Sequence, residues 1–472
     1  MTLLTEMMDH QQIGYDKLKN LTVGALHMDT GTGKTRTMLQ LIQKRLDENK
    51  ISKVLWITLV SVKKNLAEDI QKHSDFTVGM YEEDSNAFIQ ILGTQTLSSS
   101  NKAYVYLCDL VEEYGHKLQL VIDESHEFKN PGSIRAGRLM QLTSKIKYKN
   151  TLTGTPITQG MWDLYTQMYM LDPRILGYPS YNSFARSHLK FSNKYPDQID
   201  YMINQDYVID HIKPYVYQVT KKECLDLPPK TYSNRYFHPH SDEEFYEIYQ
   251  TVKNTMIDKL DIFKPNANII FMMLTYLQQI ASGHFKRNIT TREGTILEFD
   301  YSSNCRSDLL KEVVSGIDLE QHKVIIFYKY TKDLEYITLG LDTNFVVYNG
   351  LLNEKEKEMS LKRFKSKDCP VMVTNIQSGS TGLNLQHANY IIYYNSTFDY
   401  AKRIQGEDRI YRIGQEKNCH IIDLIADNTI DLKIEDSIFR KSSLVNWVRN
   451  EIKKVQENPD NWEAFKDKLL EF

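Results

Sequence analysis

The sequence has few cysteines, and none of them are closely paired. The five cysteines stand far apart, with no Cys-x-x-Cys spacing, at Cys108, Cys224, Cys305, Cys369 and Cys419. This scatter argues against a disulfide framework and a zinc knuckle, because both need cysteines at short, regular spacings. We expect free thiols in a reducing compartment.

Long apolar runs and an excess of one charge are also missing. The longest apolar stretches, such as Val54–Val62, fall far short of the roughly 20 residues that a membrane span needs. The N-terminus, MTLLTEMMDHQQ, shows no basic stretch followed by an apolar core. The sequence therefore predicts a cytoplasmic protein without a secretion signal, in a bacterial or phage-infected cell. The 58 Lys and Arg against 61 Asp and Glu give a net charge of −3, which excludes a histone-like coat but leaves room for a local phosphate-binding groove.

Short β-rich apolar runs alternate with helical patterns at both ends of the 472-residue chain. Such alternation favours parallel α/β sheets. The middle, residues 161–285, has a largely helical pattern, and the pair Pro228–Pro229 is the best candidate linker. The expected strands are Val23–Met28, Val54–Thr58, Phe88–Leu92, Leu118–Ile122 and the segment before Gly154, then Val324–Phe327, Phe345–Tyr348, Val371–Thr374, Tyr390–Tyr394 and His420–Leu424.

A glycine-rich turn, Met28-Asp29-Thr30-Gly31-Thr32-Gly33-Lys34-Thr35, lies between an expected strand and an expected helix. Glycines let the backbone wrap a phosphate closely, and a helix N-terminus adds free N–H donors and a positive dipole end. The general phosphate-loop pattern has glycine where this chain has Met28, but the GTGKT core remains specific. We predict nucleotide binding by residues of this turn, namely Gly31, Thr32, Gly33, Lys34 and Thr35. Lys34 would neutralise the β- and γ-phosphates of ATP, and the Thr35 hydroxyl would hold Mg²⁺.

Two adjacent acids, Asp123 and Glu124, end another expected strand. On their own they would be read as solvated loop residues. Together with the glycine-rich turn upstream they predict a metal-binding carboxylate, Asp123, and a base for the attacking water, Glu124.

From these two motifs onward the chain resembles superfamily-two helicases, and more narrowly the Swi/Snf-type DNA-dependent ATPases. The resemblance continues through a series of segments in the family's order: Asp123–His126, Phe128–Asn130, Leu152–Ile157, Trp162–Tyr165, Ser378–Leu385 and Gln405–Gln415. The resemblance implies two RecA-like parallel-sheet lobes in tandem, with helical insertions between them and a C-terminal helical extension. We expect a helicase ATP-binding lobe over 1–227, a helical linker over 228–300, a C-terminal helicase lobe over 301–440 and a helical extension over 441–472.

The resemblance also assigns roles to single residues. It implies that Gln11 reads the adenine edge, that Gly382 contributes to nucleotide binding, and that Gln405 belongs to the catalytic set. Arg409 and Arg412 lie three positions apart, so a helix would present both on one face. They are expected to act as arginine fingers when the lobes close on ATP, which is worth about 10³–10⁵ in rate.

By the same resemblance, the nucleic acid is held mainly through phosphate contacts, which carry no sequence code. The implied contacts are Lys64, Asn65, Thr94, Gln95, Thr374 and Asn384.

These features favour an ATP- and Mg²⁺-dependent motor that translocates on duplex DNA. The alternative is a strand-separating helicase of phage or bacterial replication or repair, whose wedge the helical middle could contain. A DNA-binding scaffold without turnover is a third reading, and the intact Lys34, Asp123, Glu124, Arg409 and Arg412 argue against it. RNA is the less favoured substrate.

Overall fold

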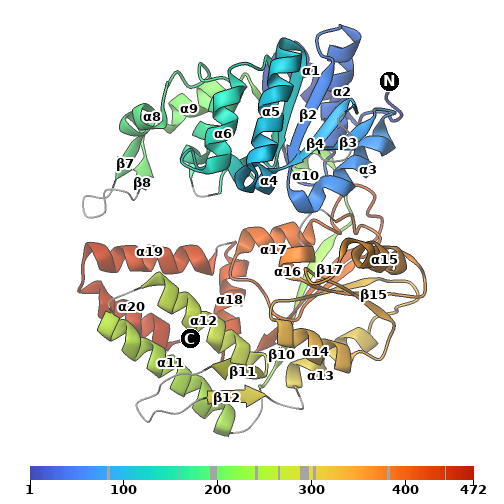
Figure 1. Cartoon of the computed structure of the whole chain (residues 1–472). Helices are drawn as coiled ribbons and strands as arrows, with labels where there is room; N and C mark the ends of the chain where they lie inside the picture. The colour runs from blue at the N-terminus through green and yellow to red at the C-terminus, as the bar shows by residue number, and fades with distance from the viewer. Residues whose placement is uncertain are drawn as a thin grey trace. The chain divides into compact units, whose positions relative to one another are not determined.

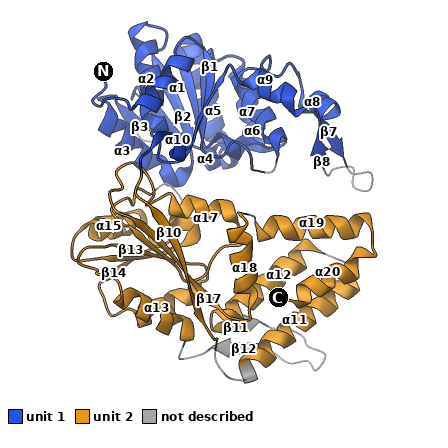
Figure 2. Ribbon diagram, turned by 180° about the vertical axis from the view of Figure 1, so that it is seen from behind, with its two compact units in different colours: residues 1–226 blue, residues 227–472 orange. Residues whose placement is uncertain are grey.

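The computed structural model divides the chain into two compact units, residues 1–226 and 227–472 (Figure 2). It describes residues 1–81, 86–158, 160–191, 199–239, 243–263, 266–287, 297–300, 304–379, 383–441 and 443–472. Each unit is built on one parallel sheet, as the sequence predicts.

The first unit contains a 7-stranded parallel sheet in the order β3-β4-β2-β5-β6-β1-β9. Four of its strands are buried almost throughout, as expected where helices cover both faces of a sheet. The order places β6 between β5 and β1, so the loops after these three strands leave one edge of the sheet side by side. The strands are β1 (Val23–Met28), β2 (Lys53–Thr58), β3 (Val78–Met80), β4 (Ile89–Gly93), β5 (Leu118–Asp123), β6 (Tyr148–Thr153) and β9 (Val216–Val219).

Helices pack on both faces of this sheet (Figure 1). On β2, Val54 and Trp56 face one apolar cluster, which includes α2 and α3, whereas Leu55 and Ile57 face another, which includes α5 and α6. This period of two fixes which side each helix covers. The helices are α1 (Asp9–Leu18), α2 (Lys34–Asp47), α3 (Lys63–His73), α4 (Thr94–Ser99), α5 (Asn101–Tyr114), α6 (Ile134–Thr143), α7 (Leu164–Leu171), α8 (Tyr181–His188), α9 (Gln205–Ile212) and α10 (Lys221–Cys224). A small antiparallel pair, β7 (Leu189–Phe191) and β8 (Ile199–Met202), follows α8.

The second unit has a 6-stranded parallel sheet in the order β10-β17-β16-β13-β15-β14. Its strands are β10 (Lys230–Phe237), β13 (Val324–Tyr328), β14 (Phe345–Tyr348), β15 (Val371–Asn375), β16 (Tyr390–Tyr393) and β17 (Cys419–Ala426). The helices near the sheet are α13 (Cys305–Ser315), α14 (Thr331–Gly340), α15 (Glu354–Lys365), α16 (Ile376–Gly379) and α17 (Tyr400–Glu407). Strands β11 (His284–Arg287) and β12 (Leu297–Asp300) form an antiparallel pair.

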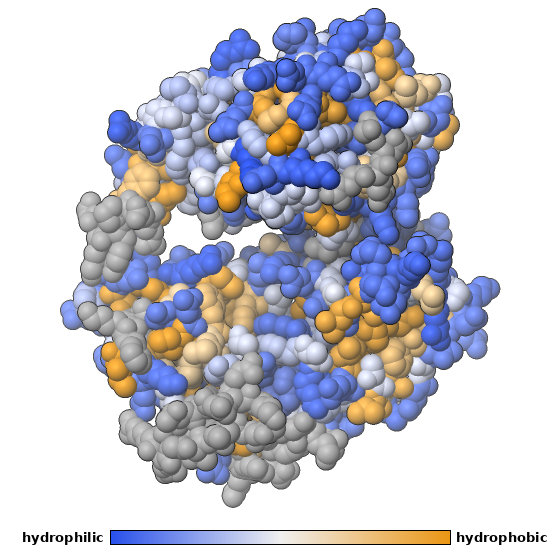
Figure 3. All heavy atoms as spheres, in the orientation of Figure 1, coloured by the Kyte–Doolittle hydropathy of each residue, from blue (hydrophilic) through white to orange (hydrophobic). Residues whose placement is uncertain are grey.

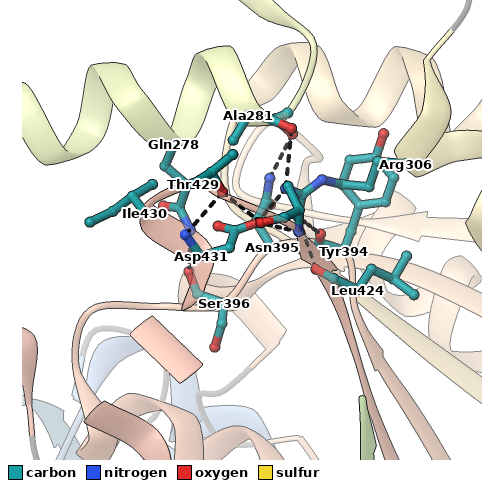
Figure 4. A network of polar contacts seen from close by, with 12 residues as sticks. Gln278, Ala281, Arg306, Tyr394, Asn395, Ser396, Leu424, Thr429, Ile430 and Asp431 are labelled. Atoms are coloured by element: carbon teal, nitrogen blue, oxygen red, sulfur yellow. Dashed lines mark hydrogen bonds and ion pairs between the residues drawn. The ribbon is translucent and has the colours of Figure 1, made fainter. Parts of the chain in front are cut away.

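A separate helical cluster completes the second unit. It is formed by α11 (Glu243–Phe263), α12 (Ala267–Ala281), α18 (Ile430–Phe439), α19 (Leu444–Glu457) and α20 (Asn461–Leu470), which share one apolar core. A buried polar network joins this cluster to the sheet (Figure 4). The fully buried Arg306 contacts Asp431 at 2.5 Å and donates to the carbonyls of Ala281, Tyr394 and Leu424.

The structure confirms the expected strands and the charged helices at the end of the chain, but the middle differs from its helical reading. Residues 216–219 and 230–237 are strands, and each forms an outer strand of one of the two sheets. The side chains of β10 are mostly polar and exposed, so this strand carries no apolar signal in the sequence. Residues 228–300 are thus not a separate linker, since β10 belongs to the second sheet and α11 and α12 to its helical cluster.

Within the described residues, no helix is long and apolar enough to cross a membrane. Hydrophilic side chains cover most of the face drawn in Figure 3, with apolar side chains in smaller groups between them. No disulfide bond joins any of the five cysteines, all of which lie within the described residues.

Candidate active site

The glycine-rich turn connects β1 to α2, so it is presented at an edge of the first sheet and at a helix N-terminus. Gly31 and Gly33 have φ of 78° and 87°, a region that glycine occupies without strain. Gly33 caps α2, and Lys34 is the first residue of that helix. The turn therefore directs the N–H groups at the start of α2 and a positive dipole end toward one point, as an anion site requires.

Lys34 is folded back onto its own turn. Its Nζ donates to the carbonyl of Met28 at 2.8 Å and to that of Asp29 at 3.3 Å. These bonds hold the ammonium group at the turn, where a bound phosphate would take the place of the carbonyls.

Gln11, predicted to read adenine, packs against the same turn. Its Nε2 donates to the Thr32 carbonyl at 3.2 Å, and His10 Nε2 lies 2.8 Å from that oxygen. A Cβ on Gly33 would lie 2.0 Å from Gln11 Nε2, so only glycine fits there without moving this side chain. Gln11 is buried and supports the turn, and its contact with the base stays a prediction.

The two acids lie where β5 ends, and their backbone geometry separates their roles. Asp123 Oδ1 accepts from the Glu124 N–H at 2.9 Å, and Thr58 Oγ1 donates to Oδ2 at 3.4 Å. Glu124 has a φ of 49°, which is uncommon for a residue other than glycine and is often found at functional sites. Burial raises the pKa of Asp123 to about 7; the nearby Glu124 charge adds to this rise and Lys34 opposes it.

His126 connects these acids to the segment after β6. Its Nδ1 lies 3.4 Å from Glu124 Oε2 and 3.0 Å from Thr153 Oγ1. The next residue, Gly154, approaches the glycine-rich turn so closely that a Cβ would lie 3.1 Å from the Thr30 nitrogen. The turn after β1, the acids after β5 and the segment after β6 therefore form one contiguous site within the first unit.

Sequence reasoning assigned no role to two polar residues that hydrogen-bond the segments after β5 and β6. Gln167 on α7 accepts from Ser125 Oγ at 2.7 Å and donates to the Pro156 carbonyl at 2.8 Å. Asp163 accepts from the N–H and the hydroxyl of Thr158, both at 2.8 Å. The only available signal was the spacing of four between Asp163 and Gln167, which places both on one helical face.

The oxygen groups present fit a magnesium ion. Mg²⁺ prefers oxygen ligands and usually keeps several waters while binding one or two carboxylates and the substrate phosphates. Thr35 and Asp123 supply such oxygens, and the part of the chain that the structure describes has no cluster of three or more metal-ligating side chains. Burial raises the pKa of Asp123 although Lys34 opposes the rise, and a bound dication would favour the charged carboxylate further.

In the second unit, Arg409 and Arg412 do not lie on a helix, so the prediction of one helical face is wrong. Helix α17 ends at Glu407, and both arginines follow it in a turn. The helix ends here because the fully buried Ile410 enters the core, and Gln415 Nε2 donates to the Ile410 carbonyl at 3.1 Å. Arg409 Nε donates to the carbonyl of Gln405 at 3.1 Å. Gly382 lies outside the described residues.

The predicted DNA contacts of the first unit divide into exposed and buried side chains. Lys64 and Gln95 are exposed, and Asn65 is partly exposed. Gln95 Oε1 accepts from the Val60 N–H at 3.0 Å. Thr94 is fully buried, and its hydroxyl donates to the Thr58 carbonyl at 3.0 Å. Its predicted phosphate contact therefore stays a prediction, which only its backbone N–H could meet in this arrangement. Its side chain joins β4 to β2 instead.

The two predicted DNA contacts of the second unit also differ. Thr374 is fully buried, and its hydroxyl donates to the Asn375 carbonyl at 3.4 Å, so its predicted phosphate contact stays a prediction. Asn384 is exposed, and its Oδ1 accepts a hydrogen bond from Arg412 Nη1. A strand end has the same sequence pattern whether its hydroxyl points into the core or out of it, so the sequence did not show that both threonine side chains are buried.

Two protein-family models match the chain, in two consecutive stretches of residues. The SNF2-related domain model matches residues 15–286, and the helicase conserved C-terminal domain model matches residues 305–414. The first includes the glycine-rich turn and the acids, and the second includes the arginines.

Similar proteins come from bacteria and a virus. Mycoplasma genitalium has the "Uncharacterized ATP-dependent helicase MG018", 24% identical over 89% of this chain and 40% of its own length. The "Probable global transactivator" of Orgyia pseudotsugata multicapsid polyhedrosis virus is 24% identical over 94% of this chain and 91% of its own.

Several other relatives are longer proteins, of which the chain spans about a third. Among solved structures, the Sulfolobus solfataricus SWI2/SNF2 ATPase core in complex with dsDNA is similar, with a TM-score of 0.43 and 23% identity over 99% of this chain and 97% of that one. Since the SNF2-related domain model matches more than half of its residues, the chain belongs to the SNF2-related family.

Proposed function

We propose that this chain is an ATP hydrolase that works as a DNA motor and translocates on duplex DNA. The observation that carries the proposal is the strand order β5-β6-β1, which assembles the glycine-rich turn, Gly154 and the acid pair at one edge of the first sheet. Membership of the SNF2-related family supports the same activity.

ATP binds through the turn after β1. The N–H groups of Gly31, Thr32 and Gly33 and the start of α2 receive the phosphates. Lys34 leaves the carbonyls of its turn and pairs with the β- and γ-phosphates, which costs little reorganisation because its ammonium group is already there.

Glu124 accepts the proton of the attacking water. Its backbone conformation and its neighbour His126 hold the carboxylate beside the turn and limit its rotation. Thr35 and Asp123 would hold Mg²⁺, which would supply positive charge to the phosphates. The remaining requirement is a positive charge on the open side of the γ-phosphate.

Arg409 and Arg412 of the second unit supply that charge when the units close on ATP. Because hydrolysis then depends on closure, each turnover is coupled to a movement of one unit against the other. Such arginines contribute about 10³–10⁵ in rate, or roughly 4–7 kcal/mol of barrier. The partly exposed position of both side chains leaves them able to move.

The experiment is an ATPase assay of the purified chain with duplex DNA, single-stranded DNA and RNA side by side. We expect stimulation by duplex DNA without displacement of an annealed oligonucleotide, and loss of all turnover in Lys34→Ala. Displacement of the oligonucleotide would support strand separation instead, and turnover by Lys34→Ala would refute the assigned site. Duplex affinity should fall steeply with salt, since phosphate contacts release counterions.

A further inference from the structure

The arginine turn, residues 408–412, has no helix of its own to fix it, so other contacts must hold Arg409 and Arg412 in place. Glu407, the last residue of α17, is the anchor directly before it and is 1% exposed. The N–H groups of Ile410 and Tyr411 donate to the Glu407 carbonyl at 3.2 and 3.0 Å, so the turn is folded on this residue.

The Glu407 carboxylate is held by two side chains of β10. Lys230 Nζ lies 2.9 Å from Oε2, and the Tyr232 hydroxyl donates to the same oxygen at 2.8 Å. The Lys230 ammonium also lies 4.9 Å from the centre of the ring of Tyr411, a residue that stands between the two arginines in the sequence. Lys230 thus contacts both the start and the middle of the arginine turn.

Arg403 adds further ion pairs to this cluster, with Glu407 and with Asp423. Arg403 is 1% exposed, donates to Glu407 Oε1 at 2.8 Å and forms a bidentate pair with Asp423 of β17 at 2.5 and 2.6 Å. The Tyr393 ring lies 3.7 Å from the Arg403 guanidinium. Two cations and two carboxylates are paired in this cluster, which compensates the burial of Arg403 and Glu407. Burial alone raises the pKa of Glu407, but Arg403 and Lys230 outweigh it, and the pKa lies below its usual value.

We propose that Lys230 and Tyr232 are positioning residues of the ATPase: through Glu407 and Tyr411 they fix where Arg409 and Arg412 are presented. β10 begins directly after Pro228–Pro229, at the junction of the two units. The ion pair between Lys230 and Glu407 therefore connects the segment that joins the two units to the arginine turn. A displacement of this segment would move the arginine turn with it.

The test compares two positions on the same face of β10, one that contacts the arginine turn and one that does not. Tyr236 on β10 donates to Glu435 of α18 at 2.6 Å, in a pair of the same chemistry away from the arginine turn. Tyr232→Phe and Lys230→Met are therefore matched with Tyr236→Phe, and Lys230→Arg keeps the charge. Readouts are kcat and KM for ATP, hydrogen exchange of the peptide covering residues 405–415, and the unfolding midpoint.

The inference rests on the proposed function for its catalytic readout, and hydrogen exchange tests it without turnover. We expect exchange in the 405–415 peptide to rise about tenfold in Lys230→Met, the effect of losing one hydrogen bond to a charged group. We expect kcat to fall by about tenfold with KM within about twofold, and Lys230→Arg to recover most of both effects. Tyr232→Phe should raise the exchange of the 405–415 peptide and lower kcat, as Lys230→Met does. Its unfolding midpoint should equal that of Tyr236→Phe.

Equal exchange in all variants would overturn the positioning role. So would a fall in kcat that Tyr236→Phe shares, because that would reflect the fold of β10 and not its contact with Glu407. A wild-type chain that does not hydrolyse ATP would refute the proposed function alone, since the exchange experiment would still decide whether Lys230 holds the turn.

Discussion

Replacing Gly154 by alanine tests whether the segment after β6 and the glycine-rich turn act as one site. The new Cβ would lie 3.1 Å from the Thr30 nitrogen and 3.3 Å from the Met28 carbonyl oxygen, both of them backbone atoms. Gly154 does not have a positive φ, so alanine adds a steric contact there without backbone strain. An ordinary contact needs at least 3.4 Å, and the turn must therefore move by a few tenths of an ångström.

The size of the effect follows from that displacement. A 1 Å misplacement costs about 10²-fold in rate, so about 0.3 Å corresponds to roughly a fourfold loss of kcat/KM for ATP. Overpacking adds about 1–3 kcal/mol of destabilisation. Steady-state ATPase assays measure the first quantity. Urea unfolding, fitted with one transition for each unit, measures the second.

Gly137 in α6 of the same unit is the matched control. A Cβ there meets nothing within 4 Å, so Gly137→Ala should leave ATPase unchanged and raise stability by about 0.5–1 kcal/mol. If Gly154→Ala behaved like Gly137→Ala in both assays, the contact between the two segments would have no role in nucleotide binding.

Three further predictions address other parts of the molecule. Arg412→Ala should lose hydrolysis while nucleotide affinity stays within a few-fold, measured by titration with a fluorescent ATP analogue; a collapse of binding would contradict the finger role. Arg306→Leu should destabilise the second unit by about 3–5 kcal/mol because Asp431 is left buried without its partner, and a double variant that also changes Asp431 to leucine should recover part of this in urea unfolding. Burial lowers the pKa of His27 to about 4, so the contribution of neutral His27 to the stability of the first unit should be complete above pH 6.5 and fall by up to about 3 kcal/mol as the pH falls to 4; a His27→Gln chain with the same acid profile would exclude this residue as the cause.

The sequence alone determined the features that are local. The glycine-rich turn, its flanking strand and helix, and the buried runs of both sheets depend on residues close together in the chain, and the structure has them where the patterns predict. The same holds for Asp123 and Glu124, because an acid pair that ends an apolar run can only lie at the edge of a sheet.

Only the tertiary structure decided which of the remaining polar residues face the core and which partners they meet. Thr94 and Thr374 are buried, and the arginines lie on a turn and not on a helix. β10 joins the second sheet although its residues are polar, because pairing with β17 supplies backbone hydrogen bonds that no side-chain pattern records. The contact of Lys230 with Glu407 joins residues 177 positions apart, and such contacts depend on how the strands are ordered in space, which local propensity does not fix.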